Sequence, residues 1–134
     1  MRAALLLLIS IAAVADPAAD VLKVFRDAAE ALTNDDGAVF LDNFDRDMPE
    51  YATLRTNVEG MLAAYEVGST IEVVSDEGDD HARNVELDWL LLANRKDAIN
   101  SVSETRRQLV KCRLERRGKR WKITRLEPVD LFQY

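Results

Sequence analysis

The sequence predicts an α+β domain in which three N-terminal helices pack on a four-stranded antiparallel sheet. The main observation is a change of period at Gly68. Before this residue the apolar side chains recur every three or four positions, as on one face of a helix, and after it they alternate, as in a strand. Because one side of each strand is then apolar, we expect the helices to cover that face of the sheet.

Three helices are expected before this boundary. Asp16 and Pro17 provide an N-cap and a first-turn proline, and apolar residues follow at helical spacing. An Asn-Asp-Asp-Gly segment then interrupts the helical pattern, and Pro49 precedes a further apolar stripe. The expected helices span 17–32 and 38–44, and a third follows Pro49 and ends near Tyr65.

The alternating runs after Gly68 predict four strands joined by short connections. The expected strands span 70–75, 83–93, 105–116 and 121–127. An acidic turn at 76–81, a polar connection at 94–102 and a tight turn at 117–119 join them.

The second strand has one apolar face, which includes Trp89, and one mixed face. The mixed face is polar at one end and apolar at the other, with Glu86, Asp88, Leu90 and Leu92. A half-apolar face indicates partial cover by a helix, a terminus or another subunit. A homodimer through this sheet face is therefore one expected partnership.

The first residues resemble a cleaved export signal. Arg2 precedes a small and apolar run, and an Ala-x-Ala site ends at Ala15. This run is shorter than the roughly 20 apolar residues that span a bilayer. We therefore predict a signal peptide over 1–15 and a single exported domain over 16–134, periplasmic or secreted, with no stable membrane anchor after cleavage.

The distribution of charge bears on nucleic-acid binding, and the position of the cysteine bears on nucleophilic catalysis. The net charge is -6, yet residues 105–134 hold 10 Lys or Arg and only 3 Asp or Glu. These basic residues alternate with apolar ones, which favours a solvated sheet face over a nucleic-acid-binding arm. Cys112, the only cysteine, alternates in phase with Val110 and Leu114, so we interpret it as a buried structural thiol rather than a nucleophile.

The order of these elements, together with five short segments, resembles the nuclear transport factor 2-like superfamily, also described as the cystatin-like cone fold. The segments are Phe40-Leu41-Asp42-Asn43-Phe44, Met48-Pro49-Glu50-Tyr51, Leu87-Asp88-Trp89, Arg117-Gly118-Lys119-Arg120-Trp121-Lys122-Ile123 and Pro128-Val129-Asp130-Leu131-Phe132. The resemblance implies a curved sheet wrapped around helices, a cone with an apolar pocket, and pairing through the sheet. It also implies that an enzyme of this kind would hold an Asp, Glu, His or Tyr inside the cone as an acid or base.

The candidate ligand-binding residues are Tyr51, Tyr65, Trp89 and Asp88. The two tyrosines lie on the stripe of the third helix, where they either pack in the core or direct a hydroxyl into the pocket. Trp89 likewise either packs in the core or contacts a ligand in the pocket. Asp88 points away from the expected core, and a cross-strand pair with Lys111 or Arg113 is favoured over general-base catalysis.

His81 and the acidic turn are not expected to be catalytic or to bind metal. His81 follows two aspartates in a turn, where an exposed position is favoured. Four acidic residues lie at 76–80, but they lack the spacing of a calcium loop. Motifs for the common cofactors are missing, so no cofactor is predicted.

Three functions remain open at this point. The preferred one is an exported domain that binds a small apolar ligand or a protein partner in or around an apolar cone. The second is an isomerase or dehydratase that uses an acid such as Asp88 or Asp42 with a tyrosine. The third is an accessory or scaffold subunit that oligomerises through its sheet.

Overall fold

The computed structural model describes residues 16–97, 99 and 103–134. Three helices come first: α1 (Pro17–Thr33), α2 (Gly37–Asp42) and α3 (Tyr51–Ala64). Four strands follow, β1 (Tyr65–Gly78), β2 (Ala82–Arg95), β3 (Glu104–Arg117) and β4 (Arg120–Glu127), and a 3₁₀ turn, η1 (Val129–Phe132), comes last. The α+β class and the order of elements are confirmed. The predicted signal segment lies outside the described residues.

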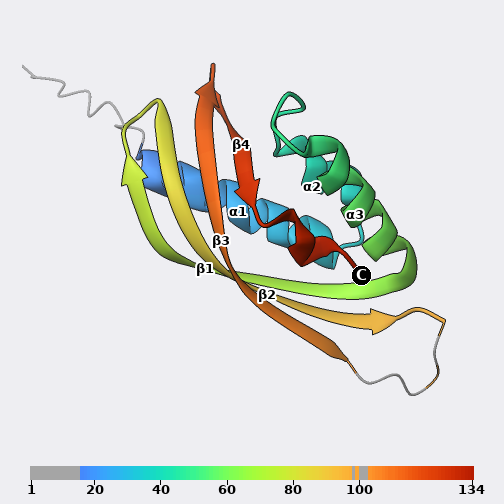
Figure 1. Ribbon diagram of the computed structural model, residues 1–134. Helices are drawn as coiled ribbons and strands as arrows, with labels where there is room; N and C mark the ends of the chain where they lie inside the picture. Colours follow the sequence, from blue (N-terminus) through green and yellow to red (C-terminus); the bar gives the residue numbers. More distant parts are fainter. Residues whose placement is uncertain (1–15, 98, 100–102) are drawn as a thin grey trace, which may run out of the picture.

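The sheet is an antiparallel meander in the order β1-β2-β3-β4. Its long strands bend strongly, so the sheet forms an open, cone-like wrap around the helices (Figure 1). Two irregularities add to this bending, one between Val73 and Ser75 in β1 and one between Arg113 and Leu114 in β3. Both lie in the half of the sheet nearer the β1–β2 and β3–β4 turns.

The helix ends follow the sequence closely. Asp16 caps α1 by accepting hydrogen bonds from the N–H groups of Ala18 and Ala19, at 3.1 and 3.4 Å. Asp36 caps α2 through the N–H of Val39 at 3.1 Å. Across the described residues, no helix is long and apolar enough to cross a membrane.

β1 is longer than the sequence predicted, and the expected acidic turn is shorter. The strand begins at Tyr65 because residues 65–69 pair with residues 91–95 of β2, despite the Gly68-Ser69 pair that indicated a break. At the other end, Asp76 still belongs to the strand, and its carboxylate pairs with Arg83 at 2.7 Å. Pairing between strands has overridden local turn preference at both ends.

The helices cover the concave face of the sheet, and α1 lies across it behind the strands in Figure 1. The loop after α2 is attached to the free edge of β4. Asp45 N–H donates to the carbonyl of Ile123 at 2.8 Å, and Ile123 N–H donates to the carbonyl of Asn43 at 2.9 Å. These bonds fix the end of α2 beside the β3–β4 turn.

Candidate functional site

The interior of the cone is filled by its own side chains. The Trp89 ring centroid lies 5.4 Å from that of Phe132 and 6.3 Å from that of Phe40, and all three side chains are fully buried. Trp89 Nε1 donates to Ser69 Oγ at 2.8 Å, so its one polar atom is satisfied within the protein. Trp89 therefore belongs to the packed core, where the apolar pocket was expected.

The described part of this interior holds no buried Asp, Glu, His, Lys or Arg. The thiol of Cys112 is buried there, between Val85 and Leu126 in the sheet register. Burial raises the pKa of this thiol far above its ordinary value. Because the thiolate is the reactive form, Cys112 is inert as a nucleophile where it lies.

Asp88 lies on the opposite face of β2 and pairs with Arg107. Arg107 Nε donates to both carboxylate oxygens, at 3.0 and 2.9 Å, and this bond is the main reason why the pKa of Asp88 is lowered. The predicted partners, Lys111 and Arg113, were wrong. Asp88 faces Leu109, so Arg107 and Lys111 occupy the two diagonal positions, and the Asp88 carboxylate is bonded to Arg107.

Tyr65 lies at the other end of the molecule, where β1 begins. Its ring centroid is 4.9 Å from that of Tyr134. The Arg106 guanidinium lies over the Tyr134 ring, 3.7 Å from its centroid. Arg106 also donates to the carbonyls of Leu131 and Gln133. These contacts attach the C-terminal segment to the sheet.

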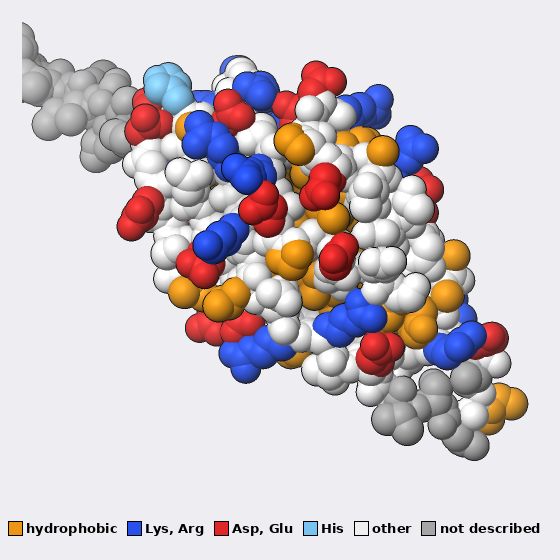
Figure 2. Space-filling model, viewed as in Figure 1, with side chains coloured by type: hydrophobic (Ala, Val, Ile, Leu, Met, Phe, Trp, Pro, Cys, Tyr) orange, Lys and Arg blue, Asp and Glu red, His pale blue; other side chains and the backbone are white. Residues whose placement is uncertain are grey.

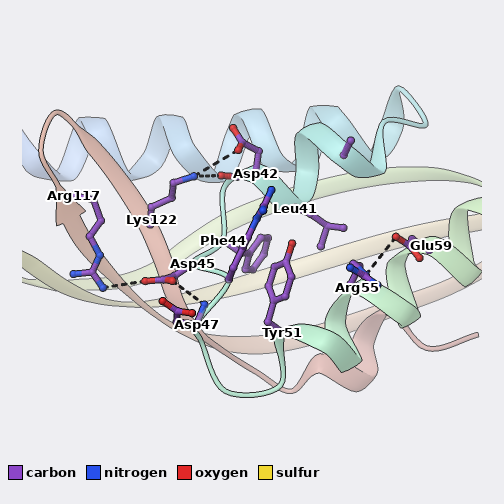
Figure 3. A pocket seen from close by; sticks show the side chains of 12 residues that line it. Leu41, Asp42, Phe44, Asp45, Asp47, Tyr51, Arg55, Glu59, Arg117 and Lys122 are labelled. Atoms are coloured by element: carbon purple, nitrogen blue, oxygen red, sulfur yellow. Dashed lines mark hydrogen bonds and ion pairs between the residues drawn. The ribbon is translucent and has the colours of Figure 1, made fainter.

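Tyr51 faces a hollow of about 840 Å³ between α2, α3 and the β3–β4 turn. Figure 3 shows its ring rising from the start of α3, with the hydroxyl directed toward Leu41. Arg55 and Glu59 follow on the same side of α3, because residues four apart share a helix face. The floor includes Leu41 and Phe44, while the rim is charged.

Two acids of this rim are held by basic residues of β3 and β4. Asp42 accepts from Arg120 Nη2 at 3.0 Å and has Lys122 Nζ at 3.7 Å, and these two contacts lower its pKa. The pKa of Asp45 is lowered first by the N–H of Asp47, at 2.9 Å, and then by Arg117, at 3.0 Å. Asp42 is exposed on the surface, outside the cone.

His81 lies exposed in the β1–β2 turn, and hydrogen bonds within the acidic segment close this turn. The His81 side chain is 82% exposed, and the single histidine is visible on the surface in Figure 2. Asp79 accepts from the backbone N–H groups of His81 and Ala82, at 2.8 and 2.9 Å, which closes the turn. Within the described ranges, no group of three or more His, Cys, Asp or Glu is arranged to hold a metal ion.

The structure does not bring the four predicted ligand-binding residues together. Trp89 is in the core, Asp88 is on the outer side of the sheet, Tyr65 contacts the C-terminal segment, and Tyr51 faces the hollow. The helices cover one side of the sheet and leave the other side open (Figure 1). We call outer face the side chains of β1, β2 and β3 that point away from the helices: Thr70, Glu72, Glu86, Asp88, Leu90, Leu92, Thr105, Arg107, Leu109 and Lys111.

No family model and no curated protein matches the chain. Solved structures do match. A nuclear transport factor 2-like protein of unknown function from Shewanella oneidensis is 14% identical, with a TM-score of 0.62 over 83% of this chain and 97% of that one. A nuclear transport factor 2-like superfamily protein from Salmonella enterica is 13% identical, with a TM-score of 0.62 over 81% and 86%.

The chain has the nuclear transport factor 2-like fold. A hexachlorocyclohexane dehydrochlorinase with this fold is 17% identical, with a TM-score of 0.64 and coverage of 81% of each chain. At such identities the likeness concerns the fold alone. Because enzymes and proteins without a known activity share the nuclear transport factor 2-like fold, the function must be argued from the residues of this chain.

Sequence reasoning missed the hollow and the partner of Asp88. The hollow has one readable signal, since Tyr51, Arg55 and Glu59 recur every four residues on a helix. Its other wall comes from residues about 70 positions away, such as Arg117 and Lys122. No pattern within one helix or strand reveals such a juxtaposition.

Proposed function

We propose that this chain is a non-catalytic interaction domain that pairs with a second copy of itself through the outer face of the sheet. The observation that carries the proposal is the contrast between the two faces. The inner face is fully packed, whereas the outer face combines exposed leucines with charges of both signs. Leu92 is 42% exposed and Leu109 is 52% exposed.

The charge pattern of the outer face suits self-pairing. Around a two-fold axis the same patch meets itself, so it must contain both members of each complementary pair. Glu72, Glu86 and Asp88 supply acids, and Arg107 and Lys111 supply bases. Figure 2, taken from the side on which the strands lie in front of α1, shows hydrophobic, acidic and basic side chains interspersed.

The packed interior weighs against the two alternatives that use the cone. A small apolar ligand would have to displace the buried rings of Trp89, Phe40 or Phe132. An isomerase or dehydratase would need a carboxylate near such a ligand, yet Asp88 lies on the outer face and Asp42 on the helical surface. Export to the periplasm or outside the cell stays part of the proposal, and it rests on the sequence of residues 1–15.

The test is the oligomeric state of two matched variants. Leu109→Lys places a charge in the proposed interface, and we expect it to shift the purified chain from dimer to monomer in sedimentation velocity over a concentration series. Val39→Lys is the control, because Val39 is 51% exposed but belongs to α2. A wild-type chain that stays monomeric at every concentration, or variants that behave alike, would refute the proposal.

A further inference from the structure

The hollow beside Tyr51 has no part in the proposed pairing, because its walls are α2, α3 and the β3–β4 turn. Its volume of about 840 Å³ lies within the range of small-molecule sites. Four acids and four bases line it, so the lining is formally neutral, although the whole chain carries a net charge of -6. The hollow is therefore less acidic than the protein as a whole.

The acids on one wall already have partners within the protein. Asp42 is held by Arg120 and Lys122, and Asp45 is held by Arg117 and a backbone N–H. These carboxylates are offset by basic groups and repel an incoming anion less than their number suggests.

The α3 wall offers donors with spare capacity. Arg55 and Glu59 are 3.7 Å apart, beyond hydrogen-bonding distance, and both side chains are mostly exposed, at 60% and 63%. A contact of this kind contributes little and is easily exchanged. The Tyr51 hydroxyl is directed into the hollow (Figure 3).

We propose that this hollow binds a small organic carboxylate. The Arg55 guanidinium exchanges its loose contact with Glu59 for a two-point contact with the ligand carboxylate, which is the geometry that guanidinium groups favour. The Tyr51 hydroxyl donates a further hydrogen bond, and the apolar part of the ligand lies against the Tyr51 ring and Leu41. In this arrangement Glu59 competes with the ligand for Arg55.

The experiment is a titration of the ¹⁵N-labelled full chain with benzoate, followed by amide chemical shifts, with benzamide as a neutral probe of the same shape. We expect saturable shifts from benzoate in α2, α3 and the β3–β4 turn, and much smaller shifts from benzamide. Equal responses to the two probes, or no saturable response to benzoate, would overturn the proposal.

Three variants sharpen the result. Arg55→Gln is expected to weaken benzoate binding by about tenfold, and Tyr51→Phe by about threefold, because each removes a donor. Glu59→Gln is expected to strengthen it by about twofold, because it removes the competitor. Arg26→Gln is the matched control, since Arg26 is an exposed arginine of α1. Weaker binding by Glu59→Gln, or equal losses from Arg26→Gln and Arg55→Gln, would show that the site does not recognise a carboxylate in this way.

Discussion

Trp89 and Asp88 are neighbours in β2, yet their side chains lie on opposite faces of the sheet, one buried and one near solvent. Trp89 is fully buried in an aromatic cluster, whereas Asp88 meets Arg107 at a surface where the arginine side chain is 70% exposed. The inner face stabilises the fold by apolar burial. The outer face buries less apolar area, and its exposed ion pairs contribute little to folding.

Replacement of Trp89 by alanine tests the inner side of this comparison and has the largest expected effect. Trp89→Ala leaves a cavity among buried rings and an unpaired Ser69 hydroxyl, so we expect a loss of about 3–5 kcal/mol in the free energy of unfolding. Urea denaturation followed by circular dichroism measures it. The exposed Leu92→Ala on the outer face should change the same quantity by less than about 0.5 kcal/mol at concentrations where the chain is monomeric.

Similar losses in Trp89→Ala and Leu92→Ala would contradict the assignment of folding stability to the inner face. A small loss in Trp89→Ala would mean that the cone interior can close around the cavity, or that it holds less tightly packed side chains than the ring distances indicate.

The reactivity of the Cys112 thiol is a second measure of how well the inner face is protected from solvent. We expect the native thiol to be unreactive toward a disulfide reagent and to react fully after denaturation, because burial raises its pKa and blocks access. Cys112→Ser should cost about 1–3 kcal/mol, since it replaces a buried thiol by a more polar hydroxyl that loses its hydrogen bonds to water. Rapid labelling of the native protein would show that the β2–β4 region opens readily.

The fold was predictable because its signals are local. The change of period at Gly68, the N-cap at Asp16 and the Asn-Asp-Asp-Gly break located the helices and the sheet. The extension of β1 back to Tyr65 was not predictable, because it depends on pairing with Arg95 across the sheet. Local preference at Gly68 indicated the opposite.

The candidate site was far less predictable, because it depends on register and on distant segments. Asp88 faces Leu109, which puts Arg107 and Lys111 at its two diagonal positions, and alternation alone did not give that register. In the same way, the wall opposite Tyr51 is brought into place by the hydrogen bonds between residues 43–45 and Ile123. The sequence indicated which side chains point away from the core, but not which of them are in contact with one another.

The smallest expected effect concerns the outer face, and its sign depends on pH. Because Arg107 lowers the pKa of Asp88, the pair stabilises the folded chain above the ordinary carboxyl range, and this contribution disappears as the pH falls through the lowered pKa. We therefore expect Asp88→Asn to be slightly less stable than the wild type at neutral pH, by less than Cys112→Ser, and to converge with it in acid. Free energies of unfolding of the monomer across this pH range measure the difference. A difference that grew on acidification would show that Asp88 is not stabilised by Arg107, and that the outer face is organised by other contacts.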